Sequence, residues 1–248
     1  MASADSPTQS PAWTGRSGYG RGRIESRCEI DCASATPEVM NKQPGVFCLE
    51  TSWADDGKDL TDKTSVEQQL RMLQGAQECG DVIHRDVATM PEFTAYLVEW
   101  LRPKYMKENR QYPLAYFAFH GFNGGFWVGD TQVSLAQLAE LIGAGRATGR
   151  IFYFGSCVTM QAPEKELRNF CRTTGAKAVV GYTKVVTWRE SAAFDCLLVP
   201  RLLEMQKMGW VYKGLRRDYS DLVHVLGLRV ATTKWATDRK IATDAAPA

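Results

Sequence analysis

The sequence has no apolar run long enough to cross a bilayer and no excess of charge of one sign. Its longest apolar segments, such as residues 114–119, are far shorter than the roughly 20 residues of a membrane-spanning helix. Thirty basic and 28 acidic residues leave a formal net charge of +2, so nothing predicts a nucleic-acid or membrane partner. The first residues, MASADSPTQSPAW, lack the basic and apolar parts of a secretory signal. We therefore predict a cytoplasmic protein.

Paired cysteines and metal-binding motifs are also missing. The seven cysteines are odd in number and scattered, unlike the pattern of a small disulfide framework. Cys28 and Cys32 have neither a second cysteine pair nor histidines nearby, so we predict no metal. The glycine-rich segment at residues 121–125 lacks the Lys-Ser/Thr of a P-loop and the GxGxxG spacing before a helix. A nucleotide-binding protein is therefore the weakest interpretation, and we expect no cofactor.

Two regions differ in composition. Residues 1–44 are rich in Ser, Pro, Gly and Arg with little apolar periodicity, which predicts a disordered N-terminal arm. From residue 45 to 248, apolar β-prone runs alternate with helical patterns, as expected for one α/β domain. The predicted strands cover residues 46–53, 81–89, 113–121, 150–157 and 176–183, with a hairpin at 124–134. The predicted helices cover residues 65–77, 90–102, 135–142, 163–174 and 191–205.

Several local signals refine these elements. Ser65 and Gln68 have the spacing of a capping box at the start of the first helix. Pro200 is expected to kink or break the last one. Strands that alternate with helices favour a mostly parallel sheet covered on both faces.

Reactive side chains follow two of the predicted strands. One strand ends in His120-Gly121 and another in Ser156-Cys157. In a parallel sheet, functional groups gather beyond the carboxyl ends of the strands. A nearby histidine lowers the pKa of a cysteine thiol and later protonates the leaving amine. The Gly121 and Cys157 N–H groups could stabilise an oxyanion. The other histidines, His84 and His224, are expected in packing or surface roles.

These residues resemble the caspase-like superfamily of cysteine peptidases, which includes caspases, metacaspases, separases and bacterial CHAT peptidases. The matching segments are AYFAFHG (115–121), IFYFGSC (151–157) and, as in the bacterial members, residues 174–195. The resemblance implies a three-layer α/β/α sandwich with a mostly parallel central sheet. It also implies that His120 is the general base and acid, Cys157 the nucleophile, and Gly121 part of the oxyanion hole.

The sequence does not decide which residues form the substrate pocket or which substrate residue the pocket prefers. Caspases usually have Gln-Ala-Cys-Arg-Gly around the nucleophile and metacaspases an acid two residues before it, whereas this chain has Gly-Ser-Cys-Val-Thr with Gly155 at that position. An arginine-lined pocket for substrate aspartate is therefore not predicted. The candidate pocket residues are Asp55, Asp56, Ser156, Trp188, Glu190 and Asp195.

By this resemblance the chain would be a cysteine endopeptidase that cleaves a protein or peptide substrate. An activating protein partner and a role in bacterial defence are further expectations from the same likeness. The alternative is a catalytically inactive caspase-like module that binds or scaffolds other proteins.

Overall fold

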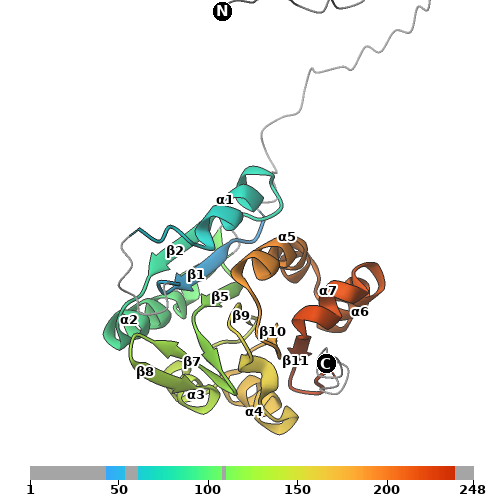
Figure 1. Ribbon diagram of the computed structural model, residues 1–248. Coiled ribbons are helices and arrows are strands. Elements are labelled where there is room, and N and C mark those ends of the chain that lie inside the picture. The colour runs from blue at the N-terminus through green and yellow to red at the C-terminus, as the bar shows by residue number, and fades with distance from the viewer. Residues whose placement is uncertain (1–42, 54–60, 108–109, 238–248) are drawn as a thin grey trace, which may run out of the picture. The chain divides into compact units, whose positions relative to one another are not determined.

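A six-stranded sheet forms the centre of the computed structural model, which describes residues 43–53, 61–107 and 110–237. The strand order is β11-β10-β9-β5-β1-β2, and every neighbouring pair is parallel except β10 and β11 (Figure 1). The strands are β1 (Val46–Glu50), β2 (Val82–Asp86), β5 (Leu114–Ala118), β9 (Ile151–Phe154), β10 (Ala178–Tyr182) and β11 (Leu228–Ala231). Apart from its last two residues, the predicted arm 1–44 lies outside the described residues.

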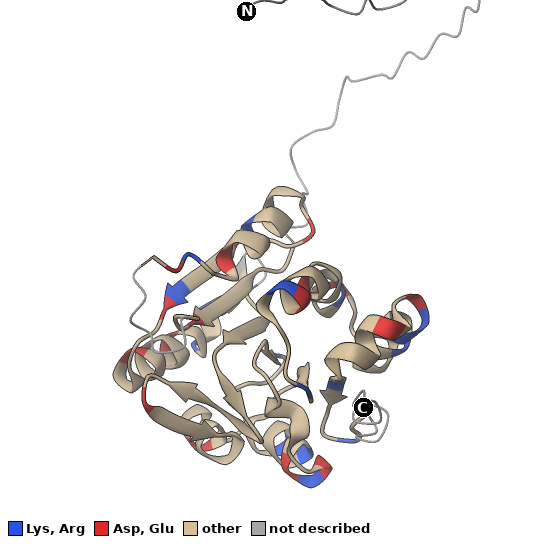
Figure 2. Cartoon of the chain, viewed as in Figure 1, with Lys and Arg blue, Asp and Glu red and all other residues tan. Residues whose placement is uncertain are grey.

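Both faces of the sheet are buried, which explains the uninterrupted apolar runs of its strands. Successive residues of β5 point to opposite faces, so Phe117 belongs to one core and Tyr116 to the other. β5, β9 and β10 contain no charged residue, and charged residues gather mainly on the helices (Figure 2). Strands buried on both faces read as continuous rather than alternating apolar sequence.

Helices cover the two faces as separate layers. One layer contains α2 (Met90–Trp100), α3 (Leu135–Ile142) and α4 (Glu164–Thr174). The other contains α1 (Glu67–Gly75), α5 (Trp188–Glu204), α6 (Met208–Asp218) and α7 (Ser220–Leu226). The predicted three-layer α/β/α sandwich with a mostly parallel central sheet is confirmed. Among the described residues, no helix combines the length and apolar character that crossing a bilayer requires.

Shorter elements complete the connections. The predicted hairpin is confirmed as β7 (Gly125–Val128) and β8 (Thr131–Ser134), which form a small sheet with β6 (Gly121–Phe122). The remaining short elements are η1 (Pro103–Tyr105), β3 (Met106–Lys107), β4 (Arg110–Gln111) and the 3-10 helix η2 (Thr159–Gln161).

Two local predictions differ from the structure. Val66, not Ser65, is the N-cap of α1, and the capping box of Ser65 and Gln68 does not form. The Ser65 hydroxyl donates to Glu50 Oε2 at 2.6 Å and accepts from Glu67 N, the first residue of α1, at 3.1 Å, so it connects the buried carboxylate to the helix start. Pro200 lies inside α5 without breaking it, and a kink at this residue stays a prediction. Pro200 is buried, and the burial of its apolar ring offsets the missing backbone hydrogen bond.

Candidate active site

His120 and Cys157 lie at the carboxyl ends of two neighbouring strands. His120 follows β5 after one intervening residue, and its side chain is exposed. Cys157 follows β9 after two intervening residues and is half-buried. Because β5 and β9 pair in parallel, with Phe117 opposite Phe154, both strand ends open at the same edge of the sheet. The structure therefore places the two residues that the sequence singled out after neighbouring strand ends.

Gly121 brings the backbone after β5 into direct contact with the segment after β9. A β-carbon at Gly121 would lie 2.0 Å from the carbonyl oxygen of Cys157 and 2.7 Å from Oγ1 of Thr159. Only glycine allows the two segments to approach this closely. Trp127 N donates to His120 O at 2.8 Å across the β6–β7 ladder. In an antiparallel ladder the next position along has its N–H directed away from the partner strand, so the Gly121 N–H points away from β7.

The Cys157 thiol interacts with the backbone of the segment between β10 and α5. Val186 N donates to Cys157 Sγ at 3.4 Å, and Sγ donates to Val186 O at 3.5 Å. Within the described part of the chain, no hydrogen bond joins Cys157 Sγ to His120. Catalytic pairs are often this loose before substrate binds.

The other four described cysteines have thiols that resist ionisation. Burial raises the pKa of Cys79 to about 11 and the pKa of Cys171 to about 12. Burial also raises the pKa of Cys48 and of Cys196. Because the thiolate is the nucleophile, these four side chains are poorly reactive at neutral pH.

The backbone after the candidate nucleophile is strained and firmly held. Val158 has a φ of 51°, in the left-handed region that β-branched residues rarely adopt. Arg229 on β11 is 2% exposed and donates from Nη1 to Met160 O at 2.8 Å and to Ala162 O at 2.7 Å. Backbone strain persists only where the surroundings hold it, and it is concentrated at functional sites. Neither Val158 nor Arg229 stands out in the sequence, because only the fold places them around this segment.

The His120 ring contacts Trp53, which follows β1. The two ring centroids are 5.6 Å apart and the ring planes are inclined by 72°. Trp53 is half-buried, and its Nε1 donates to Glu50 Oε1 at 2.6 Å. Glu50 ends β1 and is 1% exposed. Trp53 therefore links the exposed imidazole of His120 to a buried carboxylate.

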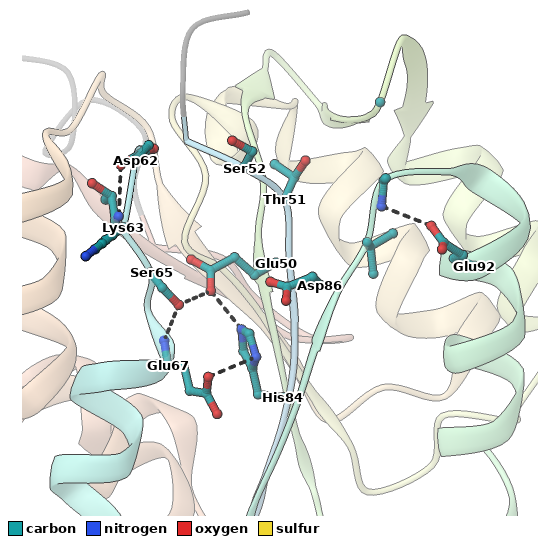
Figure 3. A pocket seen from close by; sticks show the side chains of 14 residues that line it. Glu50, Thr51, Ser52, Asp62, Lys63, Ser65, Glu67, His84, Asp86 and Glu92 are labelled. Atoms are coloured by element: carbon teal, nitrogen blue, oxygen red, sulfur yellow. Dashed lines mark hydrogen bonds and ion pairs between the residues drawn. The ribbon is translucent and has the colours of Figure 1, made fainter. Parts of the chain in front are cut away.

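Glu50 accepts four hydrogen bonds, two at each oxygen. Oε1 accepts from Trp53 Nε1 and from Val66 N, the latter at 2.7 Å. Oε2 accepts from Ser65 Oγ at 2.6 Å and from His84 Nε2 at 2.7 Å (Figure 3). This cluster was not predicted, because His84 was expected in a packing or surface role. The sequence feature that could have indicated the cluster is Glu50, a glutamate at the end of an otherwise apolar strand.

A pocket of about 710 Å³ opens beside this cluster, at the carboxyl ends of β1 and β2 (Figure 3). Its lining includes Glu50, Asp62, Glu67, Asp86 and Glu92. None of the described residues proposed from the sequence for the substrate pocket is part of this lining.

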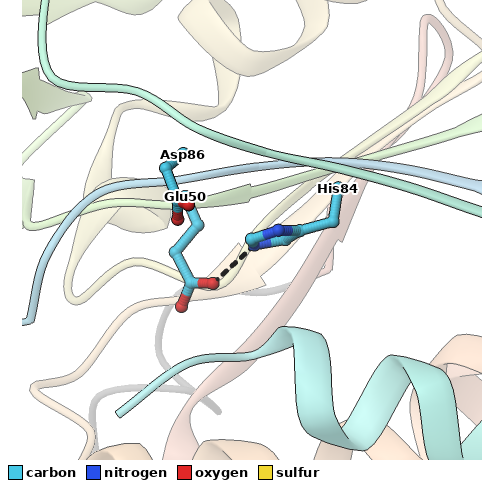
Figure 4. Close-up of side chains that lie close together, drawn as sticks. All are labelled: Glu50, His84 and Asp86. Carbon is cyan, nitrogen blue, oxygen red and sulfur yellow. Dashed lines mark hydrogen bonds and ion pairs between the residues drawn. The ribbon is translucent and has the colours of Figure 1, made fainter. Parts of the chain in front are cut away.

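Glu50, His84 and Asp86 place ligand atoms within 4.8 Å of one another, a spacing that could hold a metal ion (Figure 4). The hydrogen bonds of these residues favour binding of Glu50 to His84 over binding of a metal ion. Both oxygens of Glu50 already accept two bonds each, and Nε2 of His84 must carry a proton because its partner is a carboxylate oxygen. The other ring nitrogen, Nδ1, lies 3.5 Å from Oε2 of Glu67. A cation would have to displace these interactions, since metals bind neutral imidazole nitrogens.

The surroundings of His84 favour its charged form. Burial lowers the pKa of His84, but the hydrogen bond to Glu50 and the carboxylates of Glu50, Glu67 and Asp86 outweigh this effect. The pKa of His84 is therefore raised from its ordinary value of 6.5. When charged, His84 forms ion pairs with the buried Glu50 and with the partly exposed Glu67.

The residues proposed for the substrate pocket are dispersed. Ser156 is fully buried and donates to Phe117 O at 3.5 Å, so its side chain cannot line a surface pocket. Glu190 is exposed and accepts a hydrogen bond from Thr187 Oγ1 at 2.8 Å in the capping box of α5. Trp188 is half-buried, and its buried Nε1 has no partner among the described residues. Roles for Glu190 and Trp188 in a pocket stay predictions, and Asp55 and Asp56 lie outside the described residues.

Asp195 was interpreted wrongly as a pocket acid. It is fully buried on α5 and accepts hydrogen bonds from the hydroxyls of Tyr116, Tyr153 and Tyr182 and from Gln69 Nε2. Burial raises the pKa of Asp195 to about 6, although these four hydrogen bonds lower it. This carboxylate joins α5 and α1 to the sheet and does not contact solvent.

Comparison with protein families gives one match. Residues 43–231, which contain every strand of the central sheet, match a family of unknown function, DUF6642. The chain belongs to this family. The region matched to DUF6642 includes His120, Cys157 and the Glu50 cluster. No curated protein matches the chain.

Among solved structures, the chain is similar to a secreted C11 cysteine protease from Bacteroides thetaiotaomicron in complex with an irreversible peptide inhibitor. The sequence identity is 11% and the TM-score 0.45. The match covers 72% of this chain and 59% of that protease, so the DUF6642 chain spans little more than half of its length. The predicted CHAT subgroup and the predicted cytoplasmic location stay predictions.

Proposed function

We propose that this chain is a cysteine endopeptidase in which Cys157 is the nucleophile and His120 the general base and acid. The observation that carries the proposal is the meeting of the two segments at one sheet edge. His120-Gly121 follows β5 and Cys157 follows the neighbouring strand β9, with Gly121 against the Cys157 carbonyl. The strained backbone at Val158 beside the nucleophile is a second supporting feature.

The chemistry follows from these side chains. His120 takes the thiol proton of Cys157, and the sulfur attacks the peptide carbonyl carbon to form a C–S bond. The N–H groups of Gly121 and Cys157 stabilise the negative oxygen of the tetrahedral intermediate. The C–N bond then breaks, and His120 gives its proton to the leaving amine. Water activated by His120 hydrolyses the thioester, which releases the acid and restores the thiol.

An inactive binding module is the competing function, and one observation favours it. Cys157 Sγ is hydrogen-bonded to the backbone of Val186 and not to His120. If this arrangement persists when peptides bind, the dyad would never assemble.

Cleavage of a diverse peptide library, read by mass spectrometry, tests the proposal. Wild-type protein is compared with Cys157→Ala and with Cys196→Ala, a control that removes another half-buried thiol. We expect cuts from wild-type protein and from Cys196→Ala, and none from Cys157→Ala. The residues that flank the cuts would define the substrate preference.

Cuts that persist in Cys157→Ala would contradict the proposal. If no protein cuts, labelling of Cys157 by a peptidyl electrophile decides between the two functions. Labelling that is lost in His120→Gln would support a latent enzyme, whereas no labelling of Cys157 would favour the binding module.

A further inference from the structure

Trp53 contacts both the candidate general base His120 and the buried carboxylate of Glu50. The Trp53 indole lies edge to face with the His120 ring at a centroid distance of 5.6 Å. The indole is held by Glu50, because Nε1 donates to Glu50 Oε1 at 2.6 Å. We infer that Trp53, held by Glu50, is a positioning residue for His120. This inference rests on the proposed peptidase function of the dyad.

His120 needs such a support. It is exposed, and it lies in the turn between β5 and β6. An exposed imidazole samples several rotamers, and a general base works only in the one that faces the nucleophile. A base in a nucleophilic dyad is commonly oriented by a third group. The indole supplies an apolar wall in place of a hydrogen-bonding carboxylate.

Glu50 is suited to hold the indole because it is itself immobile. Its three other donors come from separate parts of the fold: Ser65 and Val66 at the start of α1, and His84 on β2. A carboxylate with four donors and 1% exposure has no freedom to follow a moving side chain. The position of Trp53 is thereby tied to β1, β2 and α1 together.

Substitution of Trp53 tests the inference, with Trp235→Phe as the matched control. Trp53 and Trp235 are both partly buried tryptophans that pack against the same core. Trp53→Phe keeps an aromatic ring but loses the donor to Glu50, and Trp53→Leu loses both. We expect kcat for peptide cleavage to fall about tenfold in Trp53→Leu, less in Trp53→Phe, and KM to change little. Trp235→Phe should behave as wild type.

Two readouts do not depend on cleavage. The chain has three histidines, so their ring protons can be followed by NMR, with His120 assigned by its absence in His120→Gln. The His120 titration midpoint and the pH profile of Cys157 alkylation by iodoacetamide should shift in both Trp53 variants, and the His224 titration should not. Circular dichroism confirms that each variant is folded.

The outcomes separate the inference from the proposed function. If both readouts are unchanged in folded Trp53→Leu while wild type cleaves peptides, the positioning role is wrong and the peptidase stands. If wild type neither cleaves peptides nor is labelled at Cys157 by a peptidyl electrophile, but both readouts shift, the positioning role stands and the peptidase is wrong. Should Trp53→Leu not fold, the same decision is made on Trp53→Phe.

Discussion

Glu50 and Asp195 are both fully buried carboxylates that accept four hydrogen bonds, yet their partners differ in kind. Asp195 accepts from three tyrosines and a glutamine, which stay neutral over the ordinary pH range. Glu50 accepts from a histidine that titrates and from the tryptophan beside His120. Burial and the number of hydrogen bonds therefore do not decide what a buried acid does. The Asp195 cluster joins layers of the fold, whereas the Glu50 cluster also reaches the candidate active site.

Removal of the Asp195 carboxylate should have the largest effect on stability. Asp195→Ala leaves three buried tyrosine hydroxyls and one amide without their acceptor, which we expect to lower the free energy of unfolding by about 4 kcal/mol. Urea denaturation at pH 5 measures the loss. The control Tyr182→Phe removes one donor and should cost only about 1 kcal/mol. Equal losses in the two variants would show that the cluster does not act as a unit.

The pH dependence of stability should differ between wild-type protein and Asp195→Asn, in which a neutral amide replaces the carboxyl group. Because burial raises the pKa of Asp195 from 3.8 to about 6, the folded state holds a proton that the unfolded state has already lost between these values. Its contribution to stability therefore falls as the pH rises from about 4 to about 6, by about 3 kcal/mol in total. Asp195→Asn should lack this fall. Parallel stability profiles of wild type and Asp195→Asn over this range would contradict the assignment.

Glu50→Gln should lower the stability of the fold and also change the reactivity of Cys157, which would distinguish Glu50 from Asp195. The glutamine amide presents donors to groups that already donate, so we expect a loss of about 2 kcal/mol in the free energy of unfolding. The pH profile of Cys157 alkylation should shift as well. Asp195→Asn should leave that profile unchanged. A shift in Asp195→Asn equal to that in Glu50→Gln would remove the distinction between the two carboxylates.

The smallest change in stability should come from the titration of His84, and it should occur above pH 6. Because the pKa of His84 is raised above 6.5 in the folded state, its contribution is complete below pH 6.5. That contribution is lost as the pH rises through the folded-state pKa. The effect is modest because burial opposes the carboxylates of Glu50, Glu67 and Asp86. Stability profiles of wild type and His84→Gln above pH 6 should converge, and a constant difference would rule out this titration.

The layers of the fold and the two strand ends of the candidate site could be predicted from local sequence. β5, β9 and β10 are apolar on both faces, and such runs alternating with helices leave few arrangements other than a covered parallel sheet. His120 and Cys157 follow two of these strands within three residues, so their placement at one sheet edge required only that β5 and β9 be neighbours. The edge strand β11 was not predicted, since four residues with a central arginine give little strand signal.

What the sequence determined by itself is the set of buried strands and the residues placed at their carboxyl ends, because period and apolar content are local properties. Only the tertiary structure decided the partners of the polar groups. Ser65 donates to Glu50 while it accepts from the start of α1, Arg229 holds the carbonyls after Cys157, and Asp195 faces the tyrosines of the sheet instead of a substrate. Each of these side chains has several chemically acceptable partners, and a buried polar group takes the one that the packed layers bring within hydrogen-bonding distance.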